Sequence, residues 1–173
     1  MPFPEDHRPS PLPYPDAKPV GAADFYFAIN ATFRFIGQRL GIEGLRRYWT
    51  DLGHNYFRPV STNWLQNGLT GVAAYWRAFF QAEPGAEVEV TEGSDQVVIE
   101  VRVCPAITHL RRGGRAVFPQ FCQHCYFQGE AMAAAAGMAM RLEGGNGSCR
   151  HTYSLSRPDL PAQDLNAIAE ASC

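Results

Sequence analysis

The sequence lacks a long apolar run, and it lacks an excess of charge of either sign. No window approaches the roughly 18 consecutive apolar residues that a membrane-spanning helix needs, so we expect no membrane association. Its 15 basic and 17 acidic residues give a net charge of −2. This balance does not favour binding to nucleic acid, whose recognition depends on phosphate neutralisation by basic groups.

A signal peptide is not expected either, because residues 1–20 hold seven of the thirteen prolines and no continuous apolar segment. We therefore expect a cytoplasmic protein whose thiols stay reduced. The five cysteines are an odd number, which counts against a disulfide framework. They are left to serve in core packing, as a nucleophile or as metal ligands.

Three segments are predicted along the 173 residues. Residues 1–20 form a proline-rich arm, because proline fixes its own φ and keeps the preceding residue extended. This arm is either a disordered leader or a strap over the domain or a partner subunit, so a homo-oligomer is one candidate assembly. Residues 21–157 form one α+β domain. Residues 158–173 form a tail with a short polar helix.

Apolar residues recur every three or four positions between residues 22 and 82, which predicts three helices. We expect the first to end at Gly41, the second at Arg58-Pro59 and the third at Glu83. Ser61 and Thr62 are candidate caps of the third helix. The predicted inward stripes are Phe25, Ile29, Phe33, Ile36 and Leu40 on the first helix, and Leu65, Leu69, Val72, Trp76 and Phe79/Phe80 on the third.

The period then changes to two, which predicts β-strands. Alternating segments on either side of Gly93-Ser94-Asp95 indicate one hairpin, and those on either side of residues 144–147 indicate a second. Helices from Pro105 to Arg112 and from about Pro119 to Ala136 are expected between them. The fold class is therefore α+β: N-terminal helices followed by an antiparallel sheet of about four strands, made of two hairpins with helices inserted between them.

Cys104 stands directly before Pro105, a residue that suits the first position of a helix. A thiol at a helix N-terminus meets free backbone N–H groups and the positive end of the helix dipole, which favour the thiolate. Cys104 is thus a candidate nucleophile or soft-metal ligand. His109 follows five residues later and is a candidate base for it, if that helix is irregular enough to turn the ring back.

Cys122 and Cys125 are one helical turn apart, and Cys149 and His151 share one face of a strand. A Cys-x-x-Cys pair suits zinc or another transition metal such as iron, provided further ligands converge on it. The candidate metal ligands are Cys104, Cys122, Cys125, Cys149 and His124, although His124 lies off the cysteine face. His151 is a further candidate for ligation or proton transfer. Ordinary buried cysteines are the alternative.

With these residues in view, residues 86–155 resemble the L-2-amino-thiazoline-4-carboxylic acid hydrolase family. The resemblance is carried by Cys104-Pro105, Phe121-Cys122, the segment Met138–Leu142 and the segment Gly144–Cys149. It implies hydrolytic opening of a small ring that contains sulfur and nitrogen, with water or a thiolate attacking an amidine-like carbon. Family members commonly carry an acidic residue three places after the middle cysteine, where this chain has Cys125.

Two functions therefore follow, and the first is the one that we predict; a structural dimerisation domain with a cysteine-rich core is a third possibility. The first is a hydrolase that acts on a C–N or C–S bond of a small cyclic amidine or thiazoline-type metabolite through Cys104, His109 and His151, with a metal if the cysteines converge. The second is a non-catalytic sensor or carrier of a metal or small ligand, since the helix-then-sheet layout also resembles 4-vinyl-reductase-type binding domains. A fourth thiol at Cys125 favours a closed metal site over an open catalytic one.

Overall fold

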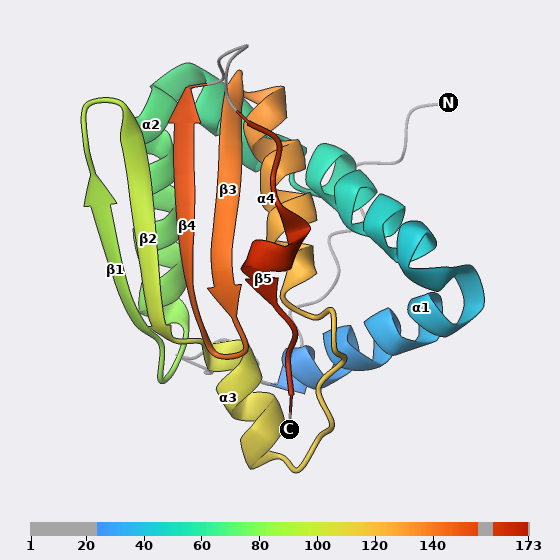
Figure 1. Ribbon diagram of the computed structural model, residues 1–173. Helices are drawn as coiled ribbons and strands as arrows, with labels where there is room; N and C mark the ends of the chain where they lie inside the picture. Colours follow the sequence, from blue (N-terminus) through green and yellow to red (C-terminus); the bar gives the residue numbers. More distant parts are fainter. Residues whose placement is uncertain (1–23, 156–160, 173) are drawn as a thin grey trace, which may run out of the picture.

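The computed structural model describes residues 24–155 and 161–172 (Figure 1). The predicted arm, residues 1–20, lies outside the described residues, as does the predicted boundary near residue 157. The predicted fold class is confirmed: helices precede a sheet that is mostly antiparallel, and further helices lie between its strands.

The N-terminal region consists of helix α1 (Asp24–Asp51), a short π-helix η1 (Leu52–Tyr56) and helix α2 (Arg58–Ala82). Gly41 interrupts α1 with a φ of 68°, so the predicted break is present at that residue. The third helix begins at Arg58 rather than at the predicted Ser61 cap. Pro59 explains this early start, because proline is well tolerated in the first turn of a helix.

The predicted inward stripe of the third helix is wrong at Leu65, whose side chain is 64% exposed, whereas the neighbouring Trp64 is fully buried. Gly68 provides the reason. Its φ of 61° breaks the helical geometry, so the residues before and after it do not follow one continuous stripe. On α1 the predicted positions Phe25 and Leu40 are likewise exposed.

The described strands form a mixed sheet of order β1-β2-β4-β3-β5. Strands β1 (Glu87–Glu92) and β2 (Gln96–Val103) make the first predicted hairpin, and β3 (Met138–Gly145) and β4 (Ser148–Leu155) make the second. The two hairpins join through antiparallel pairing of β2 with β4, in which Ile99 lies opposite His151 and Val101 opposite Cys149.

The C-terminal segment differs from the prediction. The expected short helix is one 3-10 turn, η2 (Leu165–Ala167), followed by strand β5 (Ile168–Ala169), which pairs parallel to the end of β3. A two-residue strand has no alternating pattern that the sequence could reveal.

Helix α3 (Pro105–Arg112) follows β2, and helix α4 (Gln123–Ala135) begins four residues later than predicted. In Figure 1, α2 and α4 lie behind the sheet, and α1 lies beyond α4. One buried core lies between the sheet, α2 and α4, and a second lies between α1, α3 and the start of α4. Cys104 and Cys122 pack against both cores, so the cysteine cluster lies where the two meet.

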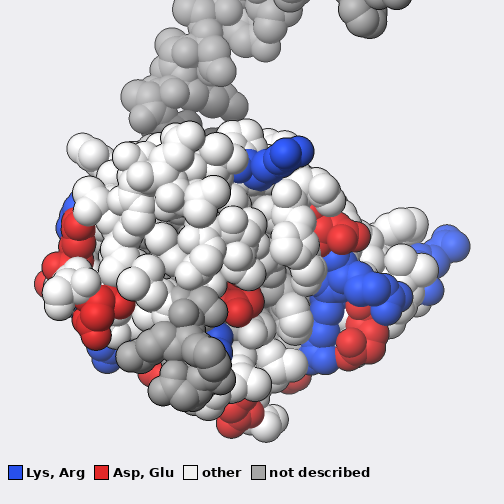
Figure 2. All heavy atoms as spheres, turned by 90° about the horizontal axis from the view of Figure 1, so that it is seen from above, with Lys and Arg blue, Asp and Glu red and all other residues white. Residues whose placement is uncertain are grey.

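Figure 2 shows a broad face on which uncharged residues predominate, with acidic and basic side chains gathered toward its sides. On the right of this view, basic and acidic side chains lie side by side. Among the described residues, no helix is both long enough and apolar enough to span a membrane.

Candidate functional site

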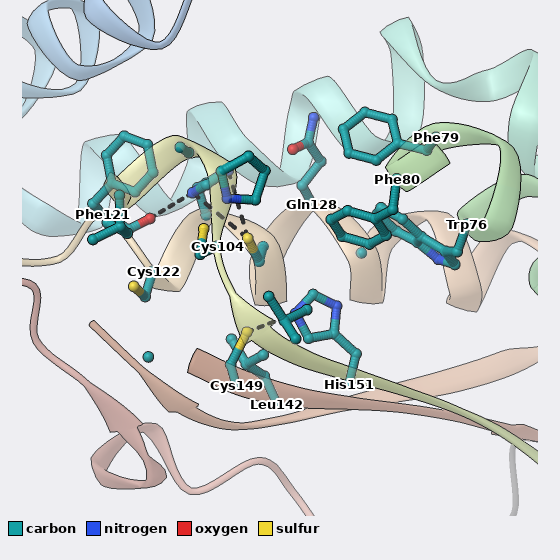
Figure 3. A pocket seen from close by; sticks show the side chains of 18 of the residues that line it. Trp76, Phe79, Phe80, Cys104, Phe121, Cys122, Gln128, Leu142, Cys149 and His151 are labelled. Carbon is teal, nitrogen blue, oxygen red and sulfur yellow. Dashed lines mark hydrogen bonds between the residues drawn. The ribbon is translucent and has the colours of Figure 1, made fainter. Parts of the chain in front are cut away.

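The cysteines line one cavity of about 160 Å³ between the sheet, the helix ends and α2 (Figure 3). Its wall includes Cys104, Cys122, Cys125 and Cys149 together with His124 and His151. The sequence left open whether Cys104 lies near the other three cysteines, and the structure places all four in the wall of this cavity. All four are free thiols.

Each thiol reaches the cavity from the end of an element. Cys104 is the N-cap of α3 and Cys122 is the N-cap of α4. Cys125 lies in the first turn of α4, and Cys149 lies near the start of β4. The cavity is thus built where one strand ends, two helices begin and a second hairpin turns.

On β4, Cys149 and His151 form a close pair, with Sγ 3.3 Å from Nε2. Successive side chains of a strand point to opposite faces, so residues two apart share a face. The imidazole of His151 is only 3% exposed, and burial lowers its pKa to about 4. Burial also raises the pKa of the Cys149 thiol, with further contributions from the other cavity cysteines. The proton therefore stays on sulfur, and the pair is uncharged at neutral pH.

His124 and Cys125 form a second contact, with Nε2 of the ring 3.6 Å from Sγ. The other ring nitrogen, Nδ1, bonds to the backbone carbonyl of Phe121. Since a carbonyl oxygen only accepts, Nδ1 carries the hydrogen and Nε2 presents its lone pair to Cys125. Burial lowers the pKa of His124 to about 4 and raises that of Cys125 to about 12, so this pair is also neutral.

Cys104 does not carry the stabilised thiolate that its helix N-terminal position predicts. Burial raises its pKa to about 11, and the backbone N–H groups of Ile107 and Ala106 offset only part of that rise. Cys122 behaves alike: burial raises its pKa to about 12, although the backbone N–H of Asn146 donates to its sulfur over 3.2 Å. The desolvation of the thiolate outweighs the helix terminus.

The β3–β4 turn closes one end of the cavity. Its two central residues, Asn146 and Gly147, both have positive φ, as a tight hairpin turn requires. The backbone N–H of Cys104 donates to the carbonyl of Gly147 over 2.8 Å. Outside the cavity, Arg111 donates to the backbone carbonyls of Asn146 and Ser172, which ties the turn to α3 and to the C-terminal segment.

His109 lies outside the cysteine cavity. Its ring packs against Phe27 at a centroid distance of 4.7 Å, and its Nε2 atom lies 3.9 Å from Asp24. It does not line the cysteine cavity. Helix α3 is regular, so a residue five positions after Cys104 points away from it, and the structure does not bring the two together as nucleophile and base.

The predicted metal site is not preformed. Among residues 24–155 and 161–172, no group of three or more His, Cys, Asp or Glu side chains is arranged to hold a metal ion. The four thiols and two imidazoles share a wall without converging on one point.

The sequence placed aromatic residues of the helices in inward stripes, and the structure shows that several helical aromatic residues line the cavity. They come from α1, α2 and the η1–α2 junction and are Tyr26, Phe57, Tyr75, Trp76, Phe79 and Phe80. No Lys, Arg, Asp or Glu side chain of the described segments lines the cavity. Tyr26 donates its hydroxyl to Glu83 over 2.6 Å, which joins α1 to the end of α2.

Comparisons of the chain with protein-family models, with curated proteins and with solved structures found no match.

Proposed function

We propose that the protein binds a small, uncharged and largely apolar molecule in the cysteine cavity, as a carrier or sensor. The observation that carries this proposal is the composition of the wall, which combines seven aromatic side chains, four protonated thiols and two neutral imidazoles. Ligand pockets are mostly apolar with a few placed polar groups.

The volume limits the size of the ligand. A dry apolar cavity of about 150 Å³ holds one benzene molecule. The cavity here, about 160 Å³, therefore suits a molecule of single-ring size. A tetrapyrrole or a nucleotide is far too large for it.

The absence of charged side chains from the described part of the wall limits the ligand's charge. An ion buried without a partner is strongly disfavoured. This argues against a carboxylate-bearing thiazoline, the substrate implied by the family resemblance, and in favour of a neutral ring. The free thiols also suit a reducing compartment such as the cytoplasm.

The test is a comparison of ring compounds of similar size and different charge. Calorimetry and thermal unfolding with benzene and toluene should show binding and a rise in the melting temperature, because a ligand that binds only the folded state stabilises it. Benzoate and benzylammonium are the matched charged probes and should do neither. Equal binding of the charged probes would refute the proposal.

A second candidate is the hydrolase, which the 3.3 Å contact between Cys149 and His151 favours over other pairings. In that function Cys149, rather than Cys104, would attack the amidine-like ring carbon, and His151 would take the thiol proton. The ring C–S bond would then break, with that proton passing to the leaving ring sulfur, and water would hydrolyse the Cys149-bound intermediate and release the thiol. A histidine with a pKa of about 4 is a weak base for a thiol whose pKa is raised, which is why binding is placed first. Ring opening of 2-amino-thiazoline-4-carboxylate, followed by mass spectrometry and lost in Cys149→Ser, would establish it.

A zinc or iron site remains a proposal that requires side-chain movement, since the described residues hold no preformed ligand group. The metal content of protein purified without chelator, compared between the wild type and Cys122→Ala, tests it.

A further inference from the structure

We propose that the ligand carries a hydroxyl group, bound between Trp76 and His151 at one end of the cavity. This inference rests on the proposed function and names the class of ligand: an uncharged single-ring alcohol or phenol.

The starting observation is a group of buried polar atoms that the described residues leave without a hydrogen-bond partner. They include Nε1 of Trp76, Nδ1 of His151 and the hydroxyl of Tyr153. Buried polar groups are nearly always paired, so each such atom requires an explanation. Trp76 and His151 line the cavity, whereas Tyr153 is fully buried and is not part of its wall.

Trp76 and His151 are neighbours in the cavity wall. Their ring centroids are 6.1 Å apart, and the rings are nearly perpendicular at 87°. The proposal places one ligand oxygen between their two unpaired nitrogen atoms, at a hydrogen-bond distance of about 2.9 Å from each. In Figure 3 the ring of His151 lies between Cys149 and the aromatic group of Trp76 and Phe80. Nε2 faces Cys149, which leaves Nδ1 for another partner.

The chemistry of the two atoms selects a hydroxyl. Nε1 of Trp76 only donates, so the ligand atom must accept. Nδ1 of His151 is a donor if the Cys149 thiol donates to Nε2, and an acceptor if Nε2 donates to sulfur. A hydroxyl satisfies both tautomers because it can accept two hydrogen bonds, or accept one and donate one. An ammonium group cannot accept at all.

Tyr153 offers Trp76 a competing partner. The Trp76 N–H lies close enough to favour charge on the Tyr153 oxygen, but neither atom completes a hydrogen bond with any group in the described segments.

The test uses phenol and toluene, which have nearly the same size and differ in a hydroxyl. Their dissociation constants are measured by calorimetry for the wild type, for Trp76→Phe and for the control Trp49→Phe. Trp49 is a fair control because it is fully buried in the other core, and its Nε1 atom also lacks a partner within the described chain. We expect the preference for phenol over toluene to fall about five- to tenfold in Trp76→Phe, the worth of one hydrogen bond, and to stay unchanged in Trp49→Phe.

A second readout does not depend on the stability of Trp76→Phe. The chain has three tryptophans, whose indole N–H signals can be assigned by elimination with Trp49→Phe and Trp64→Phe. Phenol should move the Trp76 indole proton downfield, and toluene should not.

Three results would overturn the inference. The preference for phenol could be the same in Trp76→Phe as in the wild type. The Trp76 indole signal could respond to Tyr153→Phe in the free protein and ignore phenol, which would show an internal pair. Binding of neither probe would remove the proposed function itself, whereas binding of toluene without a phenol-specific response removes only the hydroxyl.

Discussion

Sγ of Cys149 lies 3.3 Å from Nε2 of His151, two residues further along β4. In a solvated site such a contact suggests a thiolate–imidazolium pair. Here burial lowers the pKa of His151 and raises that of Cys149, so both groups are neutral and the contact is an uncharged hydrogen bond. The same holds for His124 and Cys125. The thiols and imidazoles of this largely apolar cavity are consequently uncharged.

Stability should fall as the pH drops from about 6.5 toward 4. His124 and His151 each have a folded-state pKa of about 4, lowered from 6.5 by burial, so the unfolded chain binds more protons in this window. Each histidine then contributes up to about 1.4 kcal/mol of lost unfolding free energy per pH unit. Urea unfolding at pH 7, 6, 5 and 4.5 measures the slope.

Replacing one of the two histidines should reduce the slope of unfolding free energy against pH by about the contribution of one imidazole. His151→Gln is the test variant, and His54→Gln is its control because His54 is exposed on η1. Other titrating groups affect all three proteins alike and cancel in the comparison. A slope that His151→Gln leaves unchanged would show that this imidazole has the same pKa in the folded and in the unfolded protein.

Cys104 should be alkylated slowly at neutral pH. A pKa of about 11, against an ordinary value of 9, lowers its thiolate fraction about a hundredfold. Iodoacetamide labelling between pH 7 and 9, read by mass spectrometry, should show a rate that rises about tenfold per pH unit, with Cys122 slower still. Protein unfolded in guanidinium is the reference. If folded Cys104 were labelled at that reference rate near pH 7, the result would instead support a thiolate stabilised by the helix N-terminus.

Gly53→Ala should destabilise the fold. Gly53 is buried in η1, and an added Cβ would lie 2.5 Å from the backbone carbonyl oxygen of Gln128 and 2.6 Å from Cβ of Ala131. These atoms belong to α4, whose backbone cannot yield as a flexible side chain would, so we expect a loss of about 1–3 kcal/mol. Chemical unfolding measures it. Asn55→Ala, at an exposed position of the same π-helix, should change little.

Ile168→Ala should show that β5 contributes to the core. Ile168 is 4% exposed and packs with the sheet residues, so removing most of its side chain should cost about 2–4 kcal/mol. Glu170→Ala, at an exposed neighbouring position, is the control. Equal stability of the two variants would mean that the C-terminal segment does not pack on β3 in solution.

The sequence predicted the elements of the fold that local sequence patterns determine. Both hairpins, the helix beginning after Cys104 and the break at Gly41 follow from periodicity, from proline and from glycine, which act locally. Strand β5 was missed because its two residues are held by pairing with Gly144 and Gly145, far away in the chain. The exposure of Leu65 was missed because the effect of Gly68 on the helix face depends on its backbone angles.

The sequence predicted most of the residues that form the candidate site, but not their protonation states. The spacing identified the four cysteines and His151, but not their burial, and burial reverses the expected ionisation of Cys104. The aromatic wall could not be separated from ordinary core, because Trp76 and Phe80 have the same helical spacing in either role. His109 was close to Cys104 in sequence, yet the regular turn of α3 directs it to Phe27.

The proposal that the cysteine cavity binds a small apolar molecule is tested most directly by locating where a single apolar ring binds. Met132 lines the cavity, whereas Met138 belongs to the same core without lining it. In protein labelled with ¹³C at the methionine methyl groups, titration with benzene should shift the Met132 signal in a saturable manner and leave the Met138 signal in place. An unmoved Met132 signal, or equal shifts of both, would contradict the account.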